Sequence, residues 1–301
     1  MKRLDALLFG PEAPRRLAIV HAGLVAALCV RVVAGPYREI AATTPDGLFR
    51  PPWFLAFLDS MPPVGVVMAA QVVAVVATVA WFARRCPRAA FVTLWCCYLF
   101  VAAIRDARGK ILHNDVLALL VTIPFLAAPI GDLADRRPST RTGWPLRAGC
   151  SIIALAYFFA GYHKVVRSGL EWITSDNVRH AIAWGPKPAV GRWEGLADLV
   201  TAHWLPGRIM AAGTIAFELG FLAFAFVPRL RPVLAAVATT LHIATTLLFG
   251  LDYAMWIVVL WLFALPWERY AFVDRFVRSP NARVGDGTVG FRADHVGALE
   301  E

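Results

Sequence analysis

The stretch 157–172, with the sequence YFFAGYHKVVRSGLEW, decides how the rest of the chain is interpreted. It follows on from an apolar, aromatic helix predicted over 149–162, which runs directly into His163 and Lys164. A buried lysine can act as both base and acid, which arginine cannot, and this chain otherwise uses mainly arginine. The simplest interpretation is that Lys164 reaches the lipid headgroups and marks the helix end. A functional interpretation needs partners elsewhere in the chain.

The composition is that of an integral membrane protein. The chain is 58% hydrophobic and 17% charged, with a mean hydropathy of +0.59, whereas soluble domains are about 45–50% apolar and about 25% charged. Apolar runs predict membrane spans at about 17–35, 64–82, 89–104, 112–130, 149–162, 208–227, 230–250 and 253–267. The predicted fold is therefore all-α and polytopic, with about eight transmembrane helices. The five cysteines form no CxxC pair, and no metal site is expected.

The segments between the spans predict the membrane topology. The connections 36–63 and 165–206 are rich in proline and tryptophan, which is typical of amphipathic segments at a membrane interface. A basic arm (1–16) precedes the transmembrane domain (17–267), and a polar tail (268–301) that we expect to be partly disordered follows it. Because the net charge of +9 is spread over short loops, it indicates lipid contacts and no nucleic acid. The arginine distribution places both termini in the cytoplasm, and the composition suggests a bacterial cytoplasmic membrane.

Glu218 and His242 are ionisable groups inside two consecutive predicted spans. Each lies 12 residues from Leu230 at the centre of the turn between them, so the two sit at nearly the same depth. An unpaired carboxylate near mid-membrane would be very unfavourable. We therefore predict that Glu218 and His242 share a hydrogen bond or a proton, or meet through a common third group. Such a pair can fix helix register as well as carry chemistry.

A second set of polar residues lies near the predicted outer ends of the spans. Arg31 either reaches the lipid headgroups or binds an acidic partner such as Asp115 or a ligand oxygen. His113, Asn114 and Asp115 open the fourth span, where Asn114 or Asp115 could cap the helix by accepting backbone N–H groups. Because these residues and Lys164 are predicted at the same level, one cavity could also hold all of them.

Taken together, these residues resemble a known family, the horizontally transferred transmembrane (HTTM) domain, which is the membrane part of vitamin K-dependent gamma-glutamyl carboxylase. The resemblance extends over about 17–267 and is carried, in order, by Arg31, LFRPPWF (48–54), KILHNDVLALL (110–120), YFFAGYHK (157–164) with LEW (170–172), FELGF (217–221) and His242. It implies a helical domain with its active centre towards the outer face. It also implies chemistry in which a reduced quinone, oxygen, carbon dioxide and a lysine base abstract a proton next to a glutamate side-chain carboxylate.

The chain departs from the family pattern at two motifs and in length. The family has two adjacent lysines; Lys164 matches the second, and His163 stands at the first, which is the one given the role of base. The family's Asn-His pair is replaced here by His113-Asn114. The carboxylase also has a long lumenal region after its membrane domain, so carboxylation of a protein substrate is less expected here than other proton abstraction.

Three functional hypotheses follow. In the first, the protein is a membrane enzyme for quinone- or oxygen-linked proton abstraction on a small or peptide substrate. His163 or Lys164 is the base, His113 and Asn114 orient the substrate, and Glu218 with His242 relays protons or braces the core. The second is a non-catalytic lipid- or quinone-binding accessory protein for secreted-peptide maturation or immunity. The third, a transporter, has least support because no internal repeat is visible.

Overall fold

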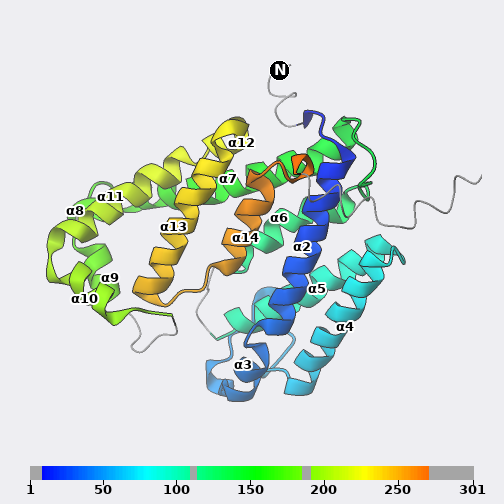
Figure 1. Cartoon of the computed structure of the whole chain (residues 1–301). Helices are drawn as coiled ribbons and strands as arrows, with labels where there is room; N and C mark the ends of the chain where they lie inside the picture. The colour runs from blue at the N-terminus through cyan, green and yellow to red at the C-terminus, as the bar shows by residue number, and fades with distance from the viewer. Residues whose placement is uncertain (1–8, 109–113, 185–190, 271–301) are drawn as a thin grey trace, which may run out of the picture.

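The computed structural model describes residues 9–108, 114–184 and 191–270, and within these ranges the chain is helical and has no strand (Figure 1). The α-helices are α2 (Pro14–Ala34), α3 (Tyr37–Thr43), α4 (Val64–Phe82), α5 (Pro87–Asp106), α6 (Val116–Ala127), α7 (Thr140–Ser168), α8 (Glu171–Thr174), α9 (Asn177–Trp184), α10 (Glu194–Ala202), α11 (Trp204–Gly220), α12 (Ala223–Phe226), α13 (Arg231–Phe249) and α14 (Ala254–Ala264). Short 3₁₀ helices are η1 (Asp46–Leu48), η2 (Trp53–Leu55), η3 (Pro228–Leu230) and η4 (Trp267–Arg269).

Six helical stretches in the described residues are long and apolar enough to cross a membrane. They are Pro14–Thr43, Val64–Phe82, Pro87–Asp106, Thr140–Ser168, Trp204–Phe226 and Pro228–Phe249. The all-α membrane class is therefore supported, but the count of eight spans is not confirmed. Helices α6 and α14, at 12 and 11 residues, are shorter than the roughly 20 residues that a span needs.

Helix α7 is longer than the predicted span 149–162. It covers 29 residues, beginning after Ser139, whose side chain accepts the backbone N–H of Thr142, and ending at Gly169, whose φ of 55° favours glycine. Lys164 consequently lies one turn inside the helix and not at its end, so its position relative to the rest of α7 is fixed.

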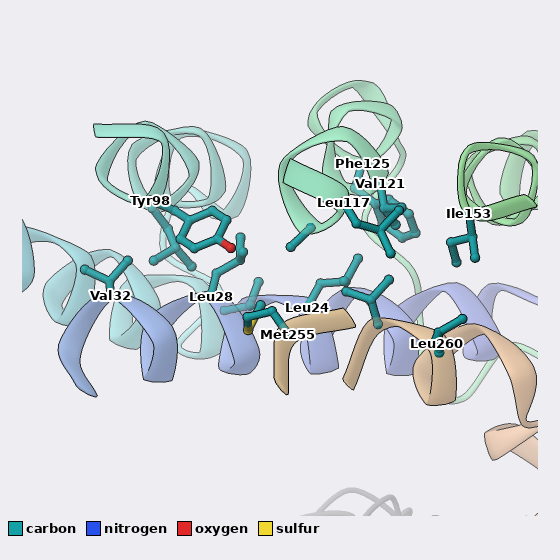
Figure 2. Close-up of a cluster of buried hydrophobic side chains, with 14 of the residues drawn as sticks. Leu24, Leu28, Val32, Tyr98, Leu117, Val121, Phe125, Ile153, Met255 and Leu260 are labelled. Atoms are coloured by element: carbon teal, nitrogen blue, oxygen red, sulfur yellow. The ribbon is translucent and has the colours of Figure 1, made fainter. Parts of the chain in front are cut away.

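The hydrophobic core is built around α2. In Figure 2, Leu24, Leu28 and Val32 form a row along α2, as residues four apart do on one helix face. Side chains of α5, α6 and α14 surround this row, including Tyr98, Leu117, Val121, Met255 and Leu260. Between helices in a lipid environment, close van der Waals packing of this kind supplies much of the association energy.

The remaining helices enclose a space beside this core. Helix α11 packs along α7, α13 packs along α14, and α7 also contacts α6 (Figure 1). The long connections form the short helices α3 and α8 to α10, with Trp53 and Trp184 exposed, as expected for interfacial segments. The predictions for the tail beyond Tyr270 and for the first eight residues lie outside the described residues.

Candidate functional site

A cavity of about 500 Å³ lies among α6, α7, α11, α13 and α14. Its walls are mostly apolar, with aromatic rings that include Trp172, Tyr253 and Trp256. The polar groups that face it are Tyr157, Lys164, Thr214, Glu218, His242, Thr245 and Tyr253. A concave, largely apolar space with a few converging polar side chains is the usual form of a small-molecule site.

Lys164 and Glu218 form an ion pair on the wall of this cavity. The Lys164 Nζ lies 2.7 Å from both Glu218 carboxylate oxygens and 5.5 Å from the centre of the Trp172 ring. The approach depends on Gly161, where a Cβ atom would lie 2.8 Å from the Glu218 Cβ. The absence of a side chain at Gly161 therefore lets α7 and α11 come close enough for the two charged groups to compensate each other.

Tyr157 and His242 form a second polar pair in the same cavity. The Tyr157 hydroxyl is hydrogen-bonded to the His242 Nε2, and both residues are buried. The Tyr157 ring stacks on Phe221 with centroids 4.1 Å apart, and the His242 ring stacks on Tyr253 with centroids 4.7 Å apart. These stacking contacts hold both rings in fixed orientations.

The two pairs are arranged along one face of α7. Tyr157 and Lys164 are seven residues apart, which is close to two helical turns, and Ala160 lies between them on the cavity wall. Glu218 and His242 approach α7 from different helices. The cavity is thus lined by a charged pair and a neutral pair, about 10 Å apart along the α7 axis.

The prediction that Glu218 and His242 bond to each other, or to one common group, is wrong. Each bonds to a different residue of α7, namely Lys164 and Tyr157. Both residues line one cavity, as their similar depth in the membrane suggests. Depth alone, however, does not determine the direction in which a side chain leaves its helix. Lys164 of α7 bonds to Glu218 of α11, and Tyr157 of α7 bonds to His242 of α13.

A separate cluster of polar residues lies near the C-terminal end of α2. It is here termed the Arg31 cluster (Arg31, Arg105, Asp115 and Asp252). The Asp115 carboxylate accepts hydrogen bonds from Arg31 Nε at 2.9 Å and from Arg105 Nη1 at 3.2 Å. The Tyr98 hydroxyl donates to the same carboxylate at 2.9 Å, and Arg31 also pairs with Asp252. The expectation that Arg31 binds Asp115 is therefore confirmed.

The Asp252 carboxylate lies in the loop between α13 and α14, next to the cavity residue Tyr253. Burial alone would raise the pKa of its carboxyl group, but the backbone N–H of Ala254 and the Arg31 guanidinium outweigh this effect. The pKa of Asp252 consequently lies below its ordinary value, and the group is ionised at neutral pH.

The helix-cap interpretation of Asn114 and Asp115 is not supported. Asp115 occupies the N-cap position of α6, but its side chain makes no capping hydrogen bond, because its oxygens bind the two arginines and Tyr98. The Asn114 side chain donates to the Asp252 carbonyl oxygen and is not among the cavity residues. A substrate-orienting role for Asn114 in the cavity thus has no geometric support.

His163, one of the two histidines proposed for catalysis, does not share the cavity position of Lys164. His163 is exposed and is not among the residues that line the cavity, because the next residue along α7 points in a different direction. His113 lies outside the described residues. Among the described residues proposed as catalytic, only Lys164 lines the cavity, together with the supporting residues Glu218 and His242.

Sequence reasoning missed Tyr157, Arg105 and Asp252. A tyrosine in an apolar helix is easily read as part of an aromatic belt, yet its seven-residue spacing from Lys164 places both on one face and could have identified it. Arg105 lies one residue beyond the predicted span 89–104, but in the structure it belongs to α5 and is buried. Asp252 offered no local signal, since its partner Arg31 is distant in the chain.

No group of three or more His, Cys, Asp or Glu side chains in the described residues could hold a metal ion. Hydrogen-bonding and aromatic side chains are the groups available for binding an organic cofactor or substrate. No protein-family model, curated protein or solved structure matches this chain, so the function has to be argued from the cavity itself.

Proposed function

We propose that the protein is a membrane enzyme that abstracts a proton from a ligand in the cavity between α7, α11 and α13, in quinone- or oxygen-linked chemistry like that of the carboxylase family. The observation that carries this proposal is the Lys164–Glu218 ion pair, which faces a largely apolar cavity. A pair that only joined α7 to α11 would not need to line a cavity. Ionisable groups inside membrane proteins that face a cavity commonly mark a functional site.

The ion pair can supply a base without separating charge. If the Lys164 ammonium gives a proton to Glu218, the products are a neutral amine and a neutral carboxylic acid, both acceptable in apolar surroundings. The amine can then accept a proton from the ligand and become ammonium again, while Glu218 holds the first proton. This proposal assigns the base to Lys164 and leaves the exposed His163 without a catalytic role.

The cavity residues also fit a reduced quinone, the cofactor that the family resemblance implies. Trp172, Tyr253 and Trp256 offer aromatic surfaces for a planar ring, and Tyr157 and Lys164 offer hydrogen bonds for ring oxygens. A bound reduced quinone would supply reducing equivalents to oxygen. The protein groups would hold the ring, keep water away from it, and hold protons on Lys164 and Glu218.

One observation favours the alternative of a non-catalytic quinone- or lipid-binding protein. Both Glu218 oxygens lie 2.7 Å from the Lys164 Nζ, so the ground state is a neutralised ammonium and not a free amine. A transporter is disfavoured because Tyr157, Phe221 and Phe224 stack in succession beside the cavity. These rings offer no polar route in that direction among the described residues.

Oxygen-dependent oxidation of reduced menadione by detergent-purified protein tests the proposal. We expect turnover by the wild type, a loss of about 100-fold or more in Lys164→Met and Glu218→Gln, and near wild-type turnover in His163→Ala. Size-exclusion profiles and unfolding temperatures would establish that each variant is folded. Full activity in Lys164→Met would refute the assignment of the base. A folded wild type without turnover that still binds the quinone would establish the binding alternative instead.

A further inference from the structure

Tyr157 and His242 form a polar pair that the proposed base does not use. Their hydrogen bond joins α7 to α13, and both side chains line the cavity. A hydrogen bond that served only to connect two helices would not need to face open space. The pair is also neutral, so it does not help to compensate the charges of Lys164 or Glu218.

The surroundings of this pair fix its geometry before a ligand binds. The Trp256 ring makes edge contacts with the rings of both Tyr157 and His242, at centroid distances of 5.4 Å and 5.5 Å. Phe221 covers the other side of Tyr157, and Tyr253 covers the His242 ring. Polar groups held in this way bind a ligand without first losing rotational freedom.

We propose that Tyr157 and His242 form a second proton-transfer unit of the cavity, which binds the hydroxyl group of a planar aromatic ligand. The inference rests on the proposed function in one respect, namely that the cavity is the ligand site. In the bound state the ligand hydroxyl donates to the Tyr157 oxygen, and the Tyr157 hydroxyl donates to His242 Nε2. Nε2 is then the unprotonated nitrogen, and the ring proton lies on Nδ1.

Proton transfer through this unit balances without any change in oxidation state. The ligand O–H bond breaks and its proton moves to the Tyr157 oxygen, while the original Tyr157 proton moves to His242 Nε2. The products are a ligand oxyanion, an unchanged tyrosine and an imidazolium. The reverse transfer restores the starting state, so the unit can act as base and then as acid.

The aromatic lining of the cavity and the acidity of a phenol both favour an aromatic hydroxyl over an aliphatic one. The rings of Trp172, Tyr253 and Trp256 line the space and match a planar ring system. A phenolic hydroxyl loses its proton near pH 10, so it is a much stronger acid and hydrogen-bond donor than an aliphatic alcohol. Because the unit lies about 10 Å from Lys164 along α7, a ligand spanning both could exchange one proton at each end.

The test compares the binding of 1-naphthol with that of its methyl ether, 1-methoxynaphthalene, to detergent-purified full-length protein. The ether keeps the two fused rings but cannot donate a hydrogen bond. We expect the wild type to bind 1-naphthol about tenfold or more tightly than the ether. The naphtholate absorption band of bound 1-naphthol would report proton transfer in the ground state, independently of turnover.

Tyr157→Phe removes only the hydroxyl group and should reduce the preference for 1-naphthol to near one, with loss of the naphtholate absorption. Tyr162→Phe is the matched control, because Tyr162 is an exposed tyrosine of the same helix and is not a cavity residue. It should keep both signals.

The inference is overturned if the wild type does not distinguish the two probes, or if Tyr157→Phe keeps the wild-type preference. Its failure is separate from failure of the proposed enzyme function. Hydroxyl preference without any quinol turnover would support the Tyr157–His242 unit and contradict the enzyme. Quinol turnover that depends on Lys164, with no hydroxyl preference, would support the enzyme and contradict the unit.

Discussion

The cavity and the Arg31 cluster are both polar regions inside an apolar protein, but their polar groups are satisfied in different ways. In the Arg31 cluster two arginines face two carboxylates, and both Asp115 oxygens bind groups of the protein. In the cavity, Lys164, Glu218, Tyr157 and His242 bond in pairs and still face open space. Charged groups that bind one another on several sides indicate a structural role, whereas paired groups that face a cavity are available to a ligand.

The largest difference is expected when each region loses a carboxylate. Asp115→Ala leaves the Arg31 and Arg105 guanidinium groups without their shared partner in a buried site, a loss of about 3–5 kcal/mol. We expect this variant to aggregate or to unfold at a much lower temperature. Glu218→Gln keeps an acceptor for Lys164 at a site open to the cavity, and it should cost about 1–2 kcal/mol. Equal destabilisation of the two variants in thermal unfolding would contradict the comparison.

The close approach of α7 and α11 is the next most sensitive feature. Gly161→Ala places a methyl group against Glu218 and should destabilise the protein by about 1–3 kcal/mol and separate the Lys164–Glu218 pair. Gly213→Ala in α11 is the control, because no atom lies within 4 Å of the added Cβ. It should be neutral or stabilising by up to about 1 kcal/mol. A similar unfolding temperature for both variants would show that the helices can separate without cost.

Filling the cavity should affect ligand binding more than stability. Ala160→Trp puts an indole ring between the two polar pairs, and we expect at least about tenfold weaker binding of 1-naphthol with little change in unfolding temperature. The same substitution at Ala118, which is fully buried in the packed core, should destabilise the protein by overpacking. Unchanged naphthol affinity in Ala160→Trp would place the ligand outside this cavity.

The smallest expected effect is a pH dependence in the Arg31 cluster. Because the pKa of Asp252 is lowered in the folded protein, its stabilising contribution is present above its ordinary pKa near 3.8 and is lost as the pH falls through the folded value. The side chain is 43% exposed, so the contribution should be below about 1 kcal/mol. The wild type should exceed Asp252→Asn slightly in unfolding temperature at pH 7, and the difference should shrink as the pH falls below about 3.8. A difference that grows as the pH falls would be the wrong sign.

Much of the fold could be predicted from apolar run length, because each predicted span corresponds to a helix of the structure. Run length could not show that α6 and α14 are only 12 and 11 residues long, since apolar loop residues extend both runs in the sequence. It also could not give the true length of α7, whose polar first turns and last turns lack an apolar signal.

The contacts between polar side chains could be predicted only where a charged residue had one obvious partner of opposite charge. Arg31 and Asp115 could be paired because both were expected near the outer ends of their spans. Lys164 and Glu218 were each identified, but their pairing depends on the close approach at Gly161, which is a tertiary property. Helical depth alone suggested that Glu218 would meet His242, and the rotation of each helix about its axis decided otherwise.

Photoaffinity labelling with an azido derivative of 1-naphthol tests the central claim most directly, because it identifies the binding site without requiring turnover. We predict that the label attaches to cavity residues such as Met210, Leu241 and Trp172, that unmodified 1-naphthol competes with it, and that Ala160→Trp abolishes it. Specific, competable labelling at residues around Arg31 and Asp115 instead, or no competable labelling of a folded protein, would contradict the assignment of the cavity as the functional site.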